Sequence, residues 1–298
     1  MSRHAYLVTA HNNFSFLKKL ITLIDDDRND IFVHVDANCS EFNENEFVDF
    51  TKHSKLIFIP RTAVYWADYS LTNAQLDLMK YASENDTYKY YHFISGSDLP
   101  LKTQDQIHNF MDDKDYEFVG ICPEEVWYCL RRVKFYHPFV YNKYFRNSNF
   151  LKGLDRVVEY IQKIARVNRI KNNNIKIVDG WNWVSITDDF VRYLLKNRSF
   201  IEEIFSKTIA SDEMYVQTML INSEFYERIY DKDNLVKGSL RCIDWSDKVE
   251  RPRVFREKDY EMLINCEEAI FARKFDPKKD SVVIDKIYNY IYNAQKTD

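Results

Sequence analysis

The sequence predicts an α/β fold in which helices flank both faces of a mostly parallel, twisted sheet. Short apolar runs, typical of buried strands, alternate with segments whose apolar residues recur every three or four positions, as on a packed helix. The 298 residues are 45% hydrophobic and 30% charged, a composition typical of a folded soluble chain. This length allows one large domain or two modest ones.

The first third of the chain shows the alternation most clearly. Apolar runs predict strands at 5–10, 31–35, 56–59 and 90–94. Apolar residues at helical spacing predict helices over 14–24, 71–81 and 103–111, and the last begins with the capping-box spacing of Thr103 and Gln106. Ligands of such sheets bind at the carboxyl ends of the strands. Asp36 and Asp98 each directly follow a predicted strand, which makes them candidates for a ligand site.

The rest of the chain is predicted to add further strands and helices. Strand-like runs occupy 180–186 and 240–245, and helices are expected at about 187–197, 199–208, 211–220 and 282–291. Ser211 is the expected N-cap of the third of these helices, with two acidic residues in its first turn. Residues 271–276 are expected to form an irregular basic piece.

Residues 130–176 form a basic segment that differs from the rest of the chain. It holds 12 Lys and Arg against two acids, Asp155 and Glu159, whereas the whole chain has a net charge of -4. Within it one apolar helix face is predicted, made by Leu154, Val157, Val158, Ile161 and Ile164. The helix could pack on the core with a solvated basic face, lie on an anionic membrane surface, or line a nucleic-acid groove. The overall negative charge argues against a general nucleic-acid binder.

Several enzyme classes are excluded by what the sequence lacks. The five glycines are scattered, so there is no Walker A loop, no GxGxxG and no GxSxG. P-loop NTPases, standard Rossmann dehydrogenases and α/β-hydrolases are therefore excluded. The five cysteines form no CxxC pair and HExxH is missing, which predicts free thiols in a reducing cytosol and no zinc site of standard spacing. Neither a signal peptide nor a transmembrane helix is expected.

Two charged clusters and one aromatic residue could carry chemistry. Asp212 and Glu213 could simply complete a helix cap, or one carboxylate could serve as a general base. Arg273 and Lys274 could be a solvated pair, or a clamp for a diphosphate. Trp183 could belong to the core or form a platform for a sugar ring.

Eight short motifs in order resemble one known family. The chain resembles the core-2/I-branching β-1,6-N-acetylglucosaminyltransferases, a family that includes the peptide O-xylosyltransferases. The matching stretches span almost the whole chain: YLVTAH at 6–11, FVHVD at 32–36, residues 66–70, ISGSDLPL at 94–101, GWNWVS at 180–185, SDEMYVQT at 211–218, LRCIDW at 240–245 and FARKFD at 271–276. Each is weak alone, but the ordered set is specific for the family and not for the sugar.

This resemblance implies a GT-A-like fold, a single nucleotide-sugar-binding domain over 1–298. Its nucleotide-binding half would be 5–120, and its acceptor and catalytic half 121–298. The implied reaction is inverting transfer of a sugar, most simply N-acetylglucosamine or a xylose-like sugar, from a UDP-sugar to a hydroxyl of a glycan acceptor. No cofactor and no divalent metal are expected, because basic residues at the diphosphate replace the metal in this family.

The resemblance also assigns roles to individual residues. Glu213 falls on the catalytic base, and Arg273 and Lys274 fall on the diphosphate-binding pair, joined by either Arg251 or Arg253. The implied donor contacts are Val8, His11, Asp36, Tyr65 and Asp98. The implied acceptor and sugar contacts are Trp183, Asp212 and Trp245.

The chain departs from the animal members, which are membrane-anchored and disulfide-bonded. It is therefore expected to resemble the bacterial members, placed in the cytoplasm or at the inner face of the plasma membrane, in surface-polysaccharide synthesis. A lipid-linked glycan acceptor and an anionic-membrane contact through 130–176 are the expected partners, with no nucleic acid. Two alternatives stay open: a glycoside hydrolase, which needs two carboxylates across one bond, and a non-catalytic carbohydrate-binding protein.

Overall fold

The computed structural model describes residues 2–122, 126–171, 174–247 and 251–296. Its central sheet has this strand order: β3 (Lys55–Phe58), β2 (Asn29–Val35), β1 (His4–Ala10), β4 (Tyr90–Ser95) and β8 (Ser185–Thr187). The first four are parallel to one another, and β8 at the edge is antiparallel to β4. The expected α/β class with a mostly parallel sheet is therefore confirmed.

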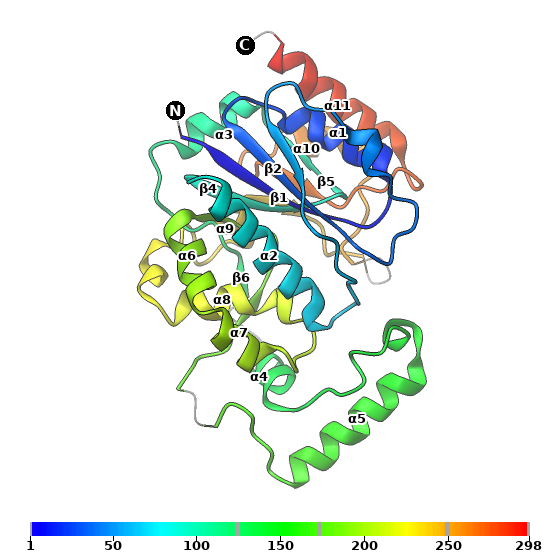
Figure 1. Ribbon diagram of the computed structural model, residues 1–298, viewed down its shortest axis with the longest axis vertical. Helices are drawn as coiled ribbons and strands as arrows, with labels where there is room; N and C mark the ends of the chain where they lie inside the picture. The colour runs from blue at the N-terminus through cyan, green and yellow to red at the C-terminus, as the bar shows by residue number, and fades with distance from the viewer. Residues whose placement is uncertain (1, 123–125, 172–173, 248–250, 297–298) are drawn as a thin grey trace.

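Helices cover both faces of this sheet because side chains alternate along its strands. Tyr6 and Val8 of β1 belong to one apolar cluster, which contains α1 (Phe14–Ile24) and α3 (Gln104–Met111). Ala5 and Leu7 belong to the opposite cluster, which contains α2 (Tyr69–Asn85) and α6 (Asp188–Lys196). Figure 1 shows these two layers on either side of the strands. The predicted capping box of Thr103 and Gln106 is present at the start of α3.

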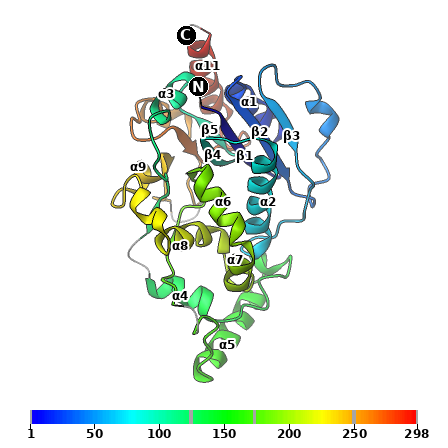
Figure 2. The same cartoon turned by 60° about the vertical axis from the view of Figure 1, so that its left-hand side comes forward.

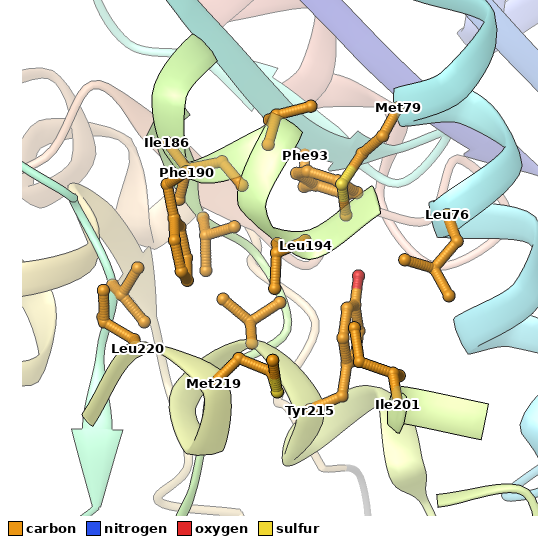
Figure 3. Close-up of a cluster of buried hydrophobic side chains, with 14 of the residues drawn as sticks. Leu76, Met79, Phe93, Ile186, Phe190, Leu194, Ile201, Tyr215, Met219 and Leu220 are labelled. Atoms are coloured by element: carbon orange, nitrogen blue, oxygen red, sulfur yellow. The ribbon is translucent and has the colours of Figure 1, made fainter. Parts of the chain in front are cut away.

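The larger apolar cluster fixes the helices below the sheet. α7 (Arg198–Phe205) and α8 (Tyr215–Ile221) pack there against α2 and α6. Figure 3 shows Tyr215, Met219 and Leu220 of α8 pointing into this cluster, toward Leu194 of α6. The position of α8 is therefore set by buried apolar contacts, and so is the short acidic turn that precedes it.

That acidic turn differs from the prediction. A continuous helix from Ser211 to Leu220 is wrong, because a 3-10 turn, Ser211–Glu213, is separated from α8 by Met214. Ser211 does not cap it; its Oγ lies 2.7 Å from Thr72 Oγ1 of α2. Ala210, directly before the turn, has φ 50°, a left-handed conformation that costs about 1–2 kcal/mol for a residue with a Cβ. Contacts with α2 thus override the local preference for a helix.

A second sheet joins distant parts of the chain. β10 (Phe271–Arg273) pairs with β9 (Arg241–Ile243) in parallel and with β5 (Asp98–Pro100) antiparallel. The expectation of an irregular piece at 271–276 is therefore wrong for its first three residues. On its outer side α10 (Tyr260–Ile264) and α11 (Ser281–Gln295) share a third apolar cluster. Shorter elements complete the fold: β6 (Ile121–Cys122) with β7 (Asp179–Gly180), and α9 (Leu235–Ser239).

The basic segment forms an arm at one end of the molecule. It contains the end of α4 (Val126–Lys134), a turn at Phe145–Asn147 and α5 (Asn149–Ile164), which lies far from the central sheet in Figures 1 and 2. The interpretation that the apolar face of α5 packs on the core is wrong for Val157, Ile161 and Ile164, which are exposed, whereas Leu154 and Val158 of that face are half-buried. Cys39, Cys129, Cys242 and Cys266 are free cysteines, as expected. No helix in the described ranges is long and apolar enough to span a bilayer.

Candidate active site

A cavity of about 360 Å³ lies at the carboxyl ends of β1, β2 and β4. The register of the strands explains its place, because Ala10 lies opposite Val35, and Thr9 opposite Ser95, so the three strands end together. The lining side chains come from these strand ends, from the loop before α2 and from three later segments: His11, Asp36, Tyr65, Trp66, Arg146, Trp183, Asp212, Glu213, Arg273 and Lys274 are among them.

A larger cavity, of about 780 Å³, lies at the amino ends of the strands. Its one arginine, Arg28, is already paired with Asp26 and Asp105. Parallel α/β sheets bind ligands at the carboxyl ends of their strands, where the loops of several units converge. The smaller cavity is therefore the candidate site.

Arg273 forms a rigid cationic wall of this cavity. Its NH1 donates to Asp98 Oδ1 and to Ser95 Oγ, each at 2.6 Å. Its guanidinium carbon lies 3.8 Å from the ring centre of Trp183, a cation–π contact. An ion pair on one side and an aromatic face on the other leave the side chain little rotational freedom. Such a preorganised guanidinium suits an anionic group, because a phosphate can accept from it without reorganisation.

Three further residues set the charge of the cavity. Lys274 follows Arg273 and also lines the wall. Burial lowers the pKa of His11, and Lys274 and Arg273 lower it further, against an opposing effect of Asp36. His11 is therefore neutral at pH 7. Asp36 Oδ1 accepts from the amides of Asn38, at 2.9 Å, and Val64, at 3.0 Å, which fixes the loop at the end of β2.

Glu213 forms the opposite, acidic part of the lining. Its Oε2 accepts from NH2 of the buried Arg132 at 2.9 Å, while 48% of its side chain stays exposed. Arg132 also donates to the carbonyl oxygens of Ile209, at 2.9 Å, and Ala210, at 2.6 Å. One guanidinium thus holds both the backbone before the acidic turn and the carboxylate on it. Glu213 is oriented by this contact rather than by an α-helix N-terminus.

Asp212 is the buried neighbour of Glu213. Burial, and next the charge of Glu213, raise its pKa to about 7. Its Oδ2 accepts from Asn182 Nδ2 at 2.7 Å. One cavity thus contains an exposed carboxylate held by an arginine and a buried carboxyl group that ionises near neutral pH. Either could accept a hydrogen bond from a hydroxyl, and Glu213 is the one that solvent and ligands can reach.

The remaining predicted site residues lie elsewhere. Val8 is fully buried in the sheet core, and Asp98 is buried behind Arg273, which it holds. Trp245 lies 6.2 Å from Trp181 between ring centres and is not among the lining residues. Arg251 and Arg253 are also not among the lining residues.

The two arginines differ in their surroundings. Arg253 is held by Asp244 at 2.6 Å and by Asp259 at 2.8 Å, so its charge is already balanced. Arg251 is exposed, and its Nε donates to the carbonyl of Asp247 at 3.1 Å. The geometry therefore gives no reason to prefer either as a partner of the Arg273 wall.

Sequence reasoning missed three residues that shape the site. The sequence places Arg132 and Arg146 in the basic segment and Trp66 in one of the family motifs, but it assigns no role to any of the three. Trp66 and Arg146 line the cavity, and Arg132 holds Glu213. Arg146 lies over the ring of Trp66 although the two residues are 80 positions apart, so no local sequence pattern indicates their contact. Within the described residues no three His, Cys, Asp or Glu side chains are grouped so that they could hold a metal ion.

Comparisons with solved structures give distant similarities. The bifunctional glycosyltransferase WbbM, in its apo form, is 13% identical, with a TM-score of 0.47, over 99% of this chain and 52% of that one. This chain thus spans about half of that structure's length. Mouse xyloside xylosyltransferase 1, apo form, is 9% identical with a TM-score of 0.36, over 90% of this chain and 96% of that one.

The apo form of the glycosyltransferase GlyE of Streptococcus pneumoniae TIGR4 is 10% identical, with a TM-score of 0.25, over 42% of this chain and 30% of that one. A comparison with curated proteins gave no match. The family comparison is decisive, because the Core-2/I-Branching enzyme model matches residues 4–265, most of the chain. The chain belongs to the Core-2/I-Branching enzyme family.

Proposed function

We propose that this protein is a glycosyltransferase that moves a sugar from a UDP-sugar to a hydroxyl of a glycan acceptor, with inversion and without a divalent metal. One observation carries the proposal. The reachable carboxylate of Glu213 and the cations Arg273 and Lys274 line the same cavity, at the strand ends where nucleotides bind in α/β folds. A carboxylate and a diphosphate clamp facing one space are what displacement of UDP requires.

The reaction is a single displacement. The acceptor hydroxyl gives its proton to Glu213 while its oxygen forms a bond to the anomeric carbon. The bond between that carbon and the β-phosphate oxygen breaks on the opposite face, so the configuration inverts, and UDP departs with the electron pair. Arg273 and Lys274 stabilise the charge that develops on the departing phosphate. Trp183 presents its ring beside Arg273, where it helps to orient the sugar.

The donor is proposed to carry N-acetylglucosamine or a xylose-like sugar, and the acceptor to be a free or lipid-linked glycan in bacterial surface-polysaccharide synthesis. Family membership supports the class of reaction, and it does not distinguish one sugar from another. The enzyme would act in the cytoplasm, on its membrane side. His11, Asp36 and Tyr65 line the part of the cavity formed by β1, β2 and the next loop, where the uridine would bind.

A thermal-shift panel tests this proposal. The purified chain is heated with UDP, with a series of UDP-sugars and with the matching ADP- and GDP-sugars, each in EDTA and in Mn²⁺. A ligand present at 100 times its Kd adds about 2.7 kcal/mol of stability, so a true donor should raise Tm clearly. We expect a shift with UDP compounds that persists in EDTA. No shift with any UDP compound would refute a UDP-sugar enzyme, and a shift that needs Mn²⁺ would refute the cationic clamp.

A further inference from the structure

The apolar side of α5 faces away from the rest of the molecule. Phe150, Leu154, Val157, Ile161 and Ile164 recur every three or four residues and therefore form one stripe along the helix. Four of them are well exposed: Phe150 by 74%, Val157 by 55%, Ile161 by 57% and Ile164 by 67%. A contiguous exposed stripe of this kind on a folded protein indicates a surface that contacts a partner.

The opposite side of α5 is polar and faces inward. Asp155 is buried and its Oδ2 lies 2.7 Å from Nδ1 of the buried His137. Gln162 is buried too, and its side-chain amide donates to the carbonyl and accepts from the amide of Tyr136, both at 2.8 Å. These contacts fix the rotation of the helix. These hydrogen bonds therefore orient the apolar stripe toward solvent.

The surface around the stripe is cationic. The two acids of the basic segment are both engaged internally: Asp155 with His137, and Glu159 with Arg131 Nε at 3.2 Å. Arg156 and Lys163, in contrast, are exposed on α5. The arm therefore exposes basic side chains on a second side of α5, whereas its two carboxylates are engaged with His137 and Arg131.

We propose that α5 is a membrane-binding helix that lies in the interface of an anionic lipid bilayer. Its aliphatic stripe would enter the acyl boundary while the lysines and arginines contact lipid phosphates, as in interfacial amphipathic helices. The positive charge of the arm and its apolar stripe together favour a membrane over a second copy of the chain or a nucleic acid. A second copy would bring one basic arm against another, which is repulsive. A nucleic acid would use the basic residues but would leave the aliphatic stripe in water.

The arm contacts the lining of the cavity. Trp66, which lines the cavity, stacks with Phe145 at 6.5 Å between ring centres. Arg146 and Lys152 lie over the same Trp66 ring, at 5.9 and 6.0 Å. Because Arg146 of the arm itself lines the cavity, a bilayer bound by α5 would lie next to a segment that contributes to the cavity lining. This part rests on the proposed function, since it would place a lipid-carried acceptor beside the donor.

Vesicle flotation of the full chain tests the proposal. The protein is mixed with vesicles of phosphatidylcholine alone, and with vesicles that also contain phosphatidylglycerol, at low and at physiological salt. We expect at least about tenfold stronger partitioning to the anionic vesicles, weakened by salt. The triple variant Val157→Gln, Ile161→Gln, Ile164→Gln should lose about tenfold or more of this partitioning. Gln favours a helix more than Val or Ile does, so α5 should persist.

Matched controls separate the arm from general surface effects. Val48→Gln removes an equally exposed aliphatic side chain elsewhere and should bind as the unaltered chain does. Arg156→Gln with Lys163→Gln should weaken anionic binding, whereas Lys80→Gln with Lys258→Gln should not.

Three results would overturn the proposal. They are equal partitioning to neutral and anionic vesicles, unchanged partitioning of the triple variant, and a vesicle-free dimer that the triple variant abolishes. The last would assign the stripe to a second copy. The thermal shift with UDP compounds is measured without lipid, so a failure of the membrane proposal is distinguishable from a failure of the proposed transferase activity.

Discussion

In the proposed reaction the carboxylate of Glu213 is the general base. Glu213→Gln keeps the shape and an oxygen that can accept from Arg132, but it removes the ability to take a proton. We expect turnover to fall by about 10²–10⁴-fold, the usual contribution of a general base, with little change in the affinity for UDP. Steady-state kinetics and calorimetric titration with UDP measure the two quantities.

An exposed glutamate far from the cavity provides the control. Glu84→Gln, at the end of α2, should leave both turnover and UDP affinity unchanged. If Glu213→Gln retained near-normal turnover, the base would have to be another group, and Asp212 would be the first to examine.

Asp212 should make stability depend on pH. Its pKa in the folded chain is raised to about 7, whereas an unfolded aspartate titrates near 4. The folded state therefore holds this proton more tightly, and stability is lost as the pH rises from about 4 to about 7.

Asp212→Asn should remove that loss, raising the free energy of unfolding by up to about 4 kcal/mol at pH 8 and by only about 1 kcal/mol at pH 5. Urea denaturation at the two pH values measures it. A gain of equal size at both would rule out titration of Asp212 as the cause. Glu117, whose pKa burial also raises to about 7, accounts for pH dependence that remains.

Local signals explain which residues could be predicted from the sequence. The capping box of Thr103 and Gln106 depends on residues three apart, so its pattern is visible in the chain itself. The contact of Arg132 with Glu213 joins residues 81 positions apart, and nothing near either residue indicates the other. The grouping of Glu213 with Arg273 and Lys274 followed from family motifs, not from spacing.

At the scale of elements, two short strands determine how Arg273 is held. β5 and β10 pair so that Asp98 lies directly opposite Arg273, and the ion pair crosses this ladder. Asp98→Asn removes the charge that fixes the guanidinium. UDP affinity should fall roughly tenfold, the worth of one charge-assisted hydrogen bond.

Stability should fall as well, by about 1–3 kcal/mol, because the arginine loses its buried counter-charge. Titration calorimetry and urea denaturation measure the two effects. Asp105→Asn is the matched control, since Asp105 pairs with Arg28 at 2.6 Å at the far end of the sheet. The Asp105→Asn variant should bind UDP as the unaltered chain does. A similar loss of UDP affinity in both variants would mean that Asp98 does not position the site.

Elements were predictable where an apolar pattern alone decides the structure. The first four strands of the central sheet and the helices between them are strongly patterned, and the sequence predicts them, whereas the single strand expected at 180–186 is replaced by two short ones, Asp179–Gly180 and Ser185–Thr187. The sequence predicts a helix start at Ser211–Glu213 in place of the observed turn, because the contact of Ser211 with Thr72 leaves no local pattern. The stripe on α5 was also found, but a helical period does not show whether a stripe faces a core or the outside.

At the scale of the whole molecule, the apolar clusters are coupled through shared strands. Leu7 and Val8 of β1 face opposite clusters, as do Phe93 and Ile94 of β4, so opening one face exposes the other. We expect one cooperative unfolding transition, with coincident urea midpoints by circular dichroism and tryptophan fluorescence.

The amides of α5, whose helix buries few apolar side chains, should exchange hydrogen at least about tenfold faster than those of α2. Exchange measured by mass spectrometry on intact protein gives this comparison. Separate midpoints would indicate two independent folding units, and equal protection of the two helices would contradict the exposed position of α5.

The pairing of Asp98 with Arg273 has a consequence for biosynthesis. The two residues are 175 positions apart, so a growing chain on the ribosome carries the aspartate long before its counter-ion exists. Strands β1 to β4 are complete by residue 95. The cationic wall is completed only much later, since it requires Arg273 and Lys274. A chain that terminates before residue 271 would therefore lack both cations, and we expect it to bind UDP more weakly than the full chain does.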